Sequence, residues 1–189
     1  MINKINGLRY SKLYIVDSDL CDIIDINQYG GQMQIELREL KKDEMRLLKD
    51  FLYEAIYIPE GMEAPDRSII EQPELALYYE DFGTGMADNC IVAEVDGKIA
   101  GAVWTRIMND YGHVDDETPS FAIALYKEYR GKGIGTKMMR QMLQTLKDQG
   151  YKKSSLAVQK ANYAVKMYEK VGFRIIDENG EEYIMVCEL

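Results

Sequence analysis

The stretch Tyr129-Arg130-Gly131-Lys132-Gly133-Ile134-Gly135-Thr136 follows a short apolar segment, Phe121 to Leu125, and leads into a helical pattern that begins at Ile134. Its three glycines within five residues let the backbone approach a ligand closely, with N–H groups turned outward. The unpaired N–H groups and the dipole of a helix start favour an anion. Arg130 and Lys132 add positive charge. The stretch therefore predicts a phosphate-binding loop.

Two other phosphate-binding patterns do not fit this stretch. A P-loop needs a glycine, four residues and then Gly-Lys-Ser/Thr, but Gly131-Lys132 is followed by Gly133, and Tyr126 stands where the first glycine belongs. A Rossmann fingerprint that starts at Gly133 needs a third glycine at position 138, which is Met138. Both alternatives are therefore excluded.

The segments around the loop alternate between strand-like and helical patterns. Asp96-Gly97 separates two strand-like runs and favours a type I′ hairpin. Ile134 to Leu146 has the apolar stripe of an amphipathic helix, which Gly150 ends. We expect further strands near 33–37, 121–125, 155–158, 173–176 and 183–187, and further helices from Asp43, from Pro73 to near Gly83, and over 162–170. This order predicts one α/β (α+β) domain with a mixed sheet.

Two motifs in this order resemble the GCN5-related N-acetyltransferase (GNAT) family. The first is Arg130-x-x-Gly133-x-Gly135, and the second is the run from Asn162 through Ala164 and Tyr168 to Gly172-Phe173. The resemblance covers residues 34–189 and implies a mostly antiparallel sheet with splayed central strands and helices on both faces. Residues 1–33 are then an N-terminal extension of unknown role.

The resemblance also implies acetyl-CoA as the acyl donor. The strand before the loop holds the pantetheine arm of this donor through its main chain, in the manner of an added strand. The loop holds the pyrophosphate, mostly through backbone N–H groups, and an asparagine contacts the donor near the pantetheine. Carried over to this sequence, the strand residues are Ile123, Ala124 and Leu125, the loop residues are Arg130, Gly131, Lys132, Gly133, Ile134, Gly135 and Thr136, and the asparagine is Asn162.

The implied reaction is direct attack of a neutral amine on the thioester. Tyr168 is expected to protonate the departing thiolate as general acid. Many relatives carry a glutamate as base at the start of the strand before the loop, and here that position is Ser120. Glu117 is our candidate to assist deprotonation; Asp116, an ordered water, or an acceptor that arrives neutral are the alternatives.

Composition narrows the class of protein. The 189 residues carry a net charge of −9 and no Lys/Arg-rich run, which argues against a nucleic-acid partner. No apolar stretch approaches the ~18 residues of a membrane span, and the first six residues do not resemble a signal peptide. Cys21, Cys90 and Cys187 lack metal-ligand spacing, so we expect no metal site and a reduced, cytoplasmic location.

The sequence therefore predicts an N-acetyltransferase that acts on a primary amine of a small molecule or peptide. A catalytically idle acyl-CoA-binding sensor is the first alternative, because Ser120 replaces the family carboxylate. An interaction protein that keeps the fold without the acyl donor is the second. GNAT domains are often dimers, so a homodimer is also considered. The acceptor itself cannot be read from the sequence, because variable loops build acceptor pockets.

Overall fold

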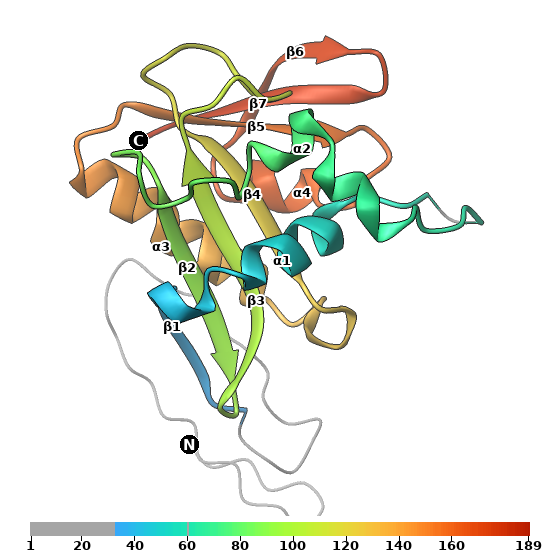
Figure 1. The fold of residues 1–189 in the computed structure, drawn as a ribbon. Helices are drawn as coiled ribbons and strands as arrows, with labels where there is room; N and C mark the ends of the chain where they lie inside the picture. Colours follow the sequence, from blue (N-terminus) through green and yellow to red (C-terminus); the bar gives the residue numbers. More distant parts are fainter. Residues whose placement is uncertain (1–32, 60) are drawn as a thin grey trace, which may run out of the picture. The chain divides into compact units, whose positions relative to one another are not determined.

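The computed structural model describes residues 33–59 and 61–189, so the predicted extension lies almost entirely outside the described residues. The described residues form seven strands, four α-helices and three short 3-10 helices (Figure 1). The strands are β1 (Ile35–Glu39), β2 (Asn89–Val95), β3 (Lys98–Arg106), β4 (Ser120–Leu125), β5 (Lys153–Gln159), β6 (Arg174–Asn179) and β7 (Glu182–Glu188). The helices are η1 (Lys42–Glu44), α1 (Leu47–Ala55), η2 (Arg67–Glu71), α2 (Pro73–Ala76), η3 (Lys127–Tyr129), α3 (Ile134–Asp148) and α4 (Val165–Lys170).

The strands form one sheet in the order β1-β2-β3-β4-β5-β7-β6. Neighbouring strands are antiparallel, with the exception of β4 and β5, which run parallel. These two strands pair at a single point, Ser120 with Ser155, so they diverge along the rest of β4. The predicted fold class, with splayed central strands in a mostly antiparallel sheet, is confirmed.

Helices cover both faces of this sheet. On one face, α1, η2 and α2 pack over β2 to β4 around the fully buried Phe51 and Trp104. On the other face, α3 and α4 pack over β2 to β7. The predicted apolar stripe of α3 is buried there, at Ile134, Met138, Met139, Met142 and Leu146. The central strands are thus held from both sides.

The predicted hairpin turn is confirmed by its backbone. Asp96 and Gly97 both have positive φ, 49° and 78°, as a type I′ turn requires. The segment after Pro73 differs from the prediction, because α2 is one helical turn and not a helix reaching Gly83. The side chain of Arg106 explains the difference. Its guanidinium donates hydrogen bonds to the carbonyl groups of Leu77, Glu80 and Asp81. Turns replace the helix there.

Gly101 is a position where β3 and β4 leave no room for a side chain. A Cβ atom at Gly101 would lie 2.3 Å from the carbonyl oxygen of Ala124 and 2.5 Å from the Leu125 side chain. We expect Gly101→Ala to lower the free energy of unfolding by about 3 kcal/mol, because a backbone atom must move. Gly97→Ala, with open space around its Cβ, is the control and costs about 1 kcal/mol of backbone strain. Equal urea midpoints for the two variants would contradict this expectation.

Candidate active site

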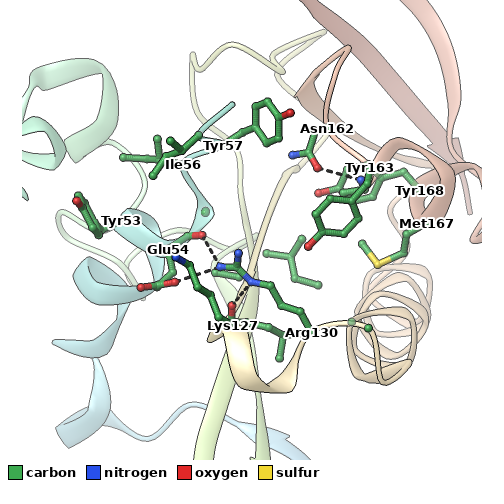
Figure 2. A pocket seen from close by; sticks show the side chains of 18 of the residues that line it. Tyr53, Glu54, Ile56, Tyr57, Lys127, Arg130, Asn162, Tyr163, Met167 and Tyr168 are labelled. Carbon is green, nitrogen blue, oxygen red and sulfur yellow. Dashed lines mark hydrogen bonds and ion pairs between the residues drawn. The ribbon is translucent and has the colours of Figure 1, made fainter. Parts of the chain in front are cut away.

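A cleft of about 720 Å³ opens where β4 and β5 separate (Figure 2). One wall is the end of α1 and the segment that follows it, and the opposite wall is the start of α4. The floor is β4, and the glycine loop lies at one end. The lining residues are Tyr53 to Pro59, Met62, Ala64, Ile123 to Leu125, Lys127, Arg130, Gly131, Gly133, Gly135, Thr136, Asn162 to Ala164, Met167 and Tyr168.

The glycine loop presents its backbone N–H groups without acceptors. Gly131 and Gly133 have φ angles of 74° and 75°, a conformation that favours glycine. Within the described part of the chain, no acceptor takes a hydrogen bond from the N–H groups of residues 131–136. No atom lies within 4 Å of a Cβ built at either glycine. The loop is therefore an open cradle of donors at the start of α3, the arrangement that binds phosphate.

Gly135 serves a different purpose from the other two glycines. A Cβ at this position would lie 3.2 Å from the Met167 sulfur and 3.5 Å from the Leu125 side chain. Its lack of a side chain lets α3, α4 and β4 meet closely at the cleft. One motif thus contains a conformational requirement at Gly133 and a packing requirement at Gly135.

Ten of the thirteen predicted site residues line this cleft. They are Ile123, Ala124, Leu125, Arg130, Gly131, Gly133, Gly135, Thr136, Asn162 and Tyr168. The other three do not. The side chain of Lys132 is exposed and lies over the Tyr129 ring, 5.8 Å from its centroid. Ile134 is buried in the core, so only its backbone faces the loop. Glu117 is exposed in the β3–β4 loop, and its role as base stays a prediction.

The Arg130 side chain lines the cleft, and its hydrogen bonds go to the ends of β4 and α1. Its Nε donates to the carbonyl of Leu125 at 2.7 Å, and its Nη2 contacts the Glu54 carboxylate at 3.1 Å (Figure 2). Nη2 also donates to the Glu54 carbonyl at 3.2 Å. This guanidinium therefore ties the end of β4 to the end of α1. Its charge is largely offset by Glu54, so the anion-binding character of the loop rests on the backbone.

Tyr168 lies at the inner side of the cleft on α4. Its ring packs edge-on against Phe173, which packs in turn against Phe121. Among the described residues, none forms a hydrogen bond with the Tyr168 hydroxyl, and burial raises the pKa of this phenol above its usual range. The hydroxyl is therefore protonated at neutral pH and available to a ligand.

Residues on opposite walls also meet across the cleft. The Tyr57 hydroxyl, from the segment after α1, donates to the carbonyl of Ala161 at 3.1 Å. Next to it, the Asn162 side-chain oxygen accepts the N–H of Ala164 at 2.9 Å and starts the turn into α4 (Figure 2). Asn162 thus combines a capping role with a position in the cleft, as its residue type permits.

Several residues of the site were not predicted from the sequence. Glu54, Tyr163 and Met167 line the cleft. Asp110 accepts a hydrogen bond from Ser120 at the point where β4 and β5 pair. Glu54 and Arg130 are 76 positions apart, and no local pattern links them. For Asp110 a weak signal existed, because it is an acidic residue in the polar loop that leads to β4.

The described residues contain no group of three potential metal ligands among His, Cys, Asp and Glu. In the same part of the chain, no helix has the length and apolar character needed to cross a membrane.

The fold and the cleft define the class: an α/β domain with a splayed parallel strand pair and a glycine loop that opens a helix at the mouth of the split. Residues 52–173 match the Acetyltransferase (GNAT) family. The chain therefore belongs to the GNAT family of N-acetyltransferases, as the two sequence motifs predicted.

Individual relatives agree with this assignment. An uncharacterised N-acetyltransferase from Archaeoglobus fulgidus is 26% identical over 141 residues, which are 71% of this chain and 88% of that protein. The probable N-acetyltransferase camello from Xenopus tropicalis is 33% identical over 86 residues, 44% of this chain, and the match spans only 37% of the frog protein. The crystal structure of PaiA N-acetyltransferase from Thermoplasma acidophilum, in complex with coenzyme A, has the same fold, with a TM-score of 0.62 at 21% identity over 82% of this chain and 99% of that one.

The Arg130–Glu54 contact generates a stability prediction. We expect Arg130→Ala to lower the free energy of unfolding by about 2 kcal/mol, because charge-assisted hydrogen bonds to Glu54 and Leu125 are lost. Arg130→Lys should recover little of this, since an ammonium cannot reach both partners with the fixed fork of a guanidinium. Lys127→Ala is the control, as no hydrogen bond or ion pair joins the Lys127 side chain to the described residues. Full stability of Arg130→Lys in urea unfolding would contradict the assigned role.

Proposed function

We propose that this protein transfers an acetyl group from acetyl-CoA to a primary amine of a small molecule or peptide. The observation that carries the proposal is the cradle of unpaired N–H groups at residues 131–136, placed at the end of a cleft whose floor is an unpaired strand edge. Family membership supports the reaction type. Acetyl-CoA supplies the activated acyl group, and the remaining chemistry belongs to the residues of this chain.

The cleft fits such a donor at both of its ends. The open space around Gly131 and Gly133 leaves room for a pyrophosphate, and Thr136, in the first turn of α3, also lines this part of the cleft. From this end, β4 extends into the cleft at Leu125, Ala124 and Ile123, beyond the single pairing point with β5. A pantetheine arm carries amide groups, and it can pair with this edge as an additional strand.

Tyr168 is the proposed general acid. Its phenol carries its proton at neutral pH, as an ordinary tyrosine does, and burial raises its pKa further. Its hydroxyl has no hydrogen bond from a described residue that would compete with a ligand. A phenol in this position can protonate a thiolate as it leaves. The packing of its ring against Phe173 holds it in place.

A catalytically idle acyl-CoA sensor is the alternative, and one observation favours it. Glu54 is the single carboxylate among the described lining residues, and it forms an ion pair with Arg130, so it is not free to act as a base. A sensor binds acetyl-CoA but transfers the acetyl group to no amine, whereas the enzyme releases thiol in the presence of an amine. Measuring free thiol after adding amine distinguishes the two.

Gly133→Glu tests the cradle directly. Acetyl-CoA at a hundred times its dissociation constant should stabilise the parent by about 2.7 kcal/mol, seen as a rise in Tm. A glutamate at Gly133 places a negative charge where the pyrophosphate binds, so the rise should disappear. Gly97→Glu is a matched control, because Gly97 has nearly the same φ, 78° against 75°, and equally open surroundings. No rise in the parent at millimolar acetyl-CoA would contradict the proposal.

Tyr168→Phe tests the general acid. We expect kcat to fall about 100-fold, the usual contribution of such a group, while acetyl-CoA still raises Tm as in the parent. Stability should be unchanged or slightly higher, because the lost hydroxyl has no partner among the described residues. Tyr151→Phe, which lies outside the cleft, is the control. An unchanged kcat in Tyr168→Phe would show that another group protonates the thiolate.

A further inference from the structure

The loop between β3 and β4 places the carboxylate of Asp110 beside Ser120, at the one point where β4 and β5 pair. The Ser120 hydroxyl donates to Asp110 Oδ1 at 2.8 Å, and the Tyr78 hydroxyl donates to Asp110 Oδ2, also at 2.8 Å. Ser120 is the residue of β4 that pairs with Ser155, and the two hydroxyl oxygens are 3.4 Å apart. Asp110 is therefore fixed to the point from which β4 and β5 diverge.

No cation neutralises this carboxylate among the described residues. None of the ion pairs found there involves Asp110. Arg106, the neighbour of Ser120 on β3, is held instead by Asp88. A half-buried carboxylate without a cationic partner is unusual, because burial of a charge is costly unless the charge is paired.

Asp110 accepts a hydrogen bond from Ser120, so it lies on the face of β4 to which the Ser120 side chain belongs. Side chains alternate along a strand, so Ser120, Ala122 and Ala124 share the face covered by α1 and α2. Ala122 is only partly buried, although it belongs to a central strand. Because α3 packs on the opposite face of the sheet, an acceptor bound on this face would not displace α3.

The direction of the bound donor follows from the position of the cradle. The loop at residues 131–136 lies beyond Leu125, so a pantetheine arm along β4 points its acyl end toward Ala122 and Ser120. Ala122 and Ser120 are two residues apart, a distance of about 7 Å along a strand. One water molecule can bridge an amine beside Ala122 and the carboxylate beside Ser120.

From this geometry we infer that Asp110 is the proton acceptor for the attacking amine, in the place that the family glutamate would fill. The inference rests on the proposed acetyl transfer. It also explains why Ser120 is compatible with catalysis: the serine holds a carboxylate supplied by the preceding loop, and does not replace it. Asp110 is the base in preference to Glu117, which is exposed in the same loop.

The proton and electron balance is as follows. The ammonium form of the acceptor gives one proton to the Asp110 carboxylate, directly or through one water, and becomes a neutral amine. Its nitrogen lone pair forms a bond to the acyl carbon, and the carbon–sulfur bond breaks with its electron pair going to sulfur. The sulfur takes the proton of the Tyr168 hydroxyl. The nitrogen, which carries one proton more than the amide product, then loses that proton, and solvent passes it to the Tyr168 phenolate. Asp110 then releases its proton, so each turnover yields one amide, one thiol and one proton.

The surroundings set the direction of the pH dependence. Burial raises the pKa of Asp110, and the hydrogen bonds from Tyr78 and Ser120 oppose this rise. Burial also raises the pKa of Tyr78, so its hydroxyl remains a donor. Glu182 of β7 and Tyr111 also raise the pKa of Tyr78, and burial raises the pKa of Glu182 itself. The His113 ring is hydrogen-bonded to the Met108 carbonyl. Because a base works only when deprotonated, activity should increase as pH rises through the elevated pKa of Asp110.

Asp110→Asn tests the inference with two probe amines of similar size. Propylamine is protonated at pH 7 and needs a base, whereas O-methylhydroxylamine is already neutral. We expect kcat/KM for propylamine to fall about 100-fold, and kcat/KM for O-methylhydroxylamine to change by less than about threefold. In the second variant, Asp110→Ala, added formate should restore propylamine turnover and chloride should not. Asp148→Asn, an exposed aspartate of α3, is the matched control.

Stability separates a catalytic from a structural role. Since burial raises the pKa of Asp110, its charged form opposes folding at neutral pH, so Asp110→Asn should keep or increase Tm. Equal loss of rate with both amines would overturn the inference, and so would a selective loss of propylamine turnover in Glu117→Gln in place of Asp110→Asn. A parent that binds acetyl-CoA but acetylates neither amine also overturns it. A parent without an acetyl-CoA-dependent rise in Tm overturns the proposed function first.

Discussion

The divergence of β4 from β5 is the constraint on which the rest of the structure depends. The two parallel strands pair only at Ser120 and Ser155, and beyond this point the edge of β4 has no partner strand. An unpaired edge inside a sheet is costly unless its polar groups find other partners. The surrounding structure keeps the split open: Arg130 ties the β4 end to α1, and α4 packs against Gly135 on the opposite side. A ligand with amide groups can then complete the sheet.

The features that could be predicted from the sequence are those that short segments determine. Positive φ at Asp96-Gly97 and at Gly133 follows from residue type, and the α3 stripe follows from its helical period. Tyr168 and Asn162 were assigned from the resemblance of the run ending in Gly172-Phe173 to the GNAT motif, and both line the cleft. Local patterning therefore recovered the element order and a mixed sheet, whereas the splayed strands and the residues of the cleft floor came from the resemblance to the GNAT family.

The features that could not be predicted depend on which distant groups come together. Arg130 was expected to add charge to the loop, but its side chain binds Glu54, which lies 76 residues away. The length of α2 was overestimated because Arg106, on a different element, takes the carbonyl groups that a longer helix would have used. Glu117 and Asp110 occupy the same polar loop, and composition does not separate them. Glu117 is exposed, whereas Asp110 reaches Ser120. Between them, Gly112 packs against the backbone of Leu156 and Ala157, and this contact constrains the path of the loop.

The phosphate-binding loop and the candidate acid and base differ in how they respond to pH. At the phosphate end, the donors are backbone N–H groups, which cannot be neutralised by a change of pH. Tyr168 in the cleft and Asp110 beside Ser120 are titratable, and burial raises the pKa of each above its usual value. Proteins commonly give up some stability to hold groups in such environments, and no ion pair offsets this cost at Asp110 among the described residues. For Asp110 the raised pKa makes the carboxylate a stronger base, whereas for Tyr168 it keeps the phenol protonated and makes it a weaker acid. Desolvation beside the split strands therefore strengthens the candidate base, whereas Tyr168 qualifies as the candidate acid by its position in the cleft.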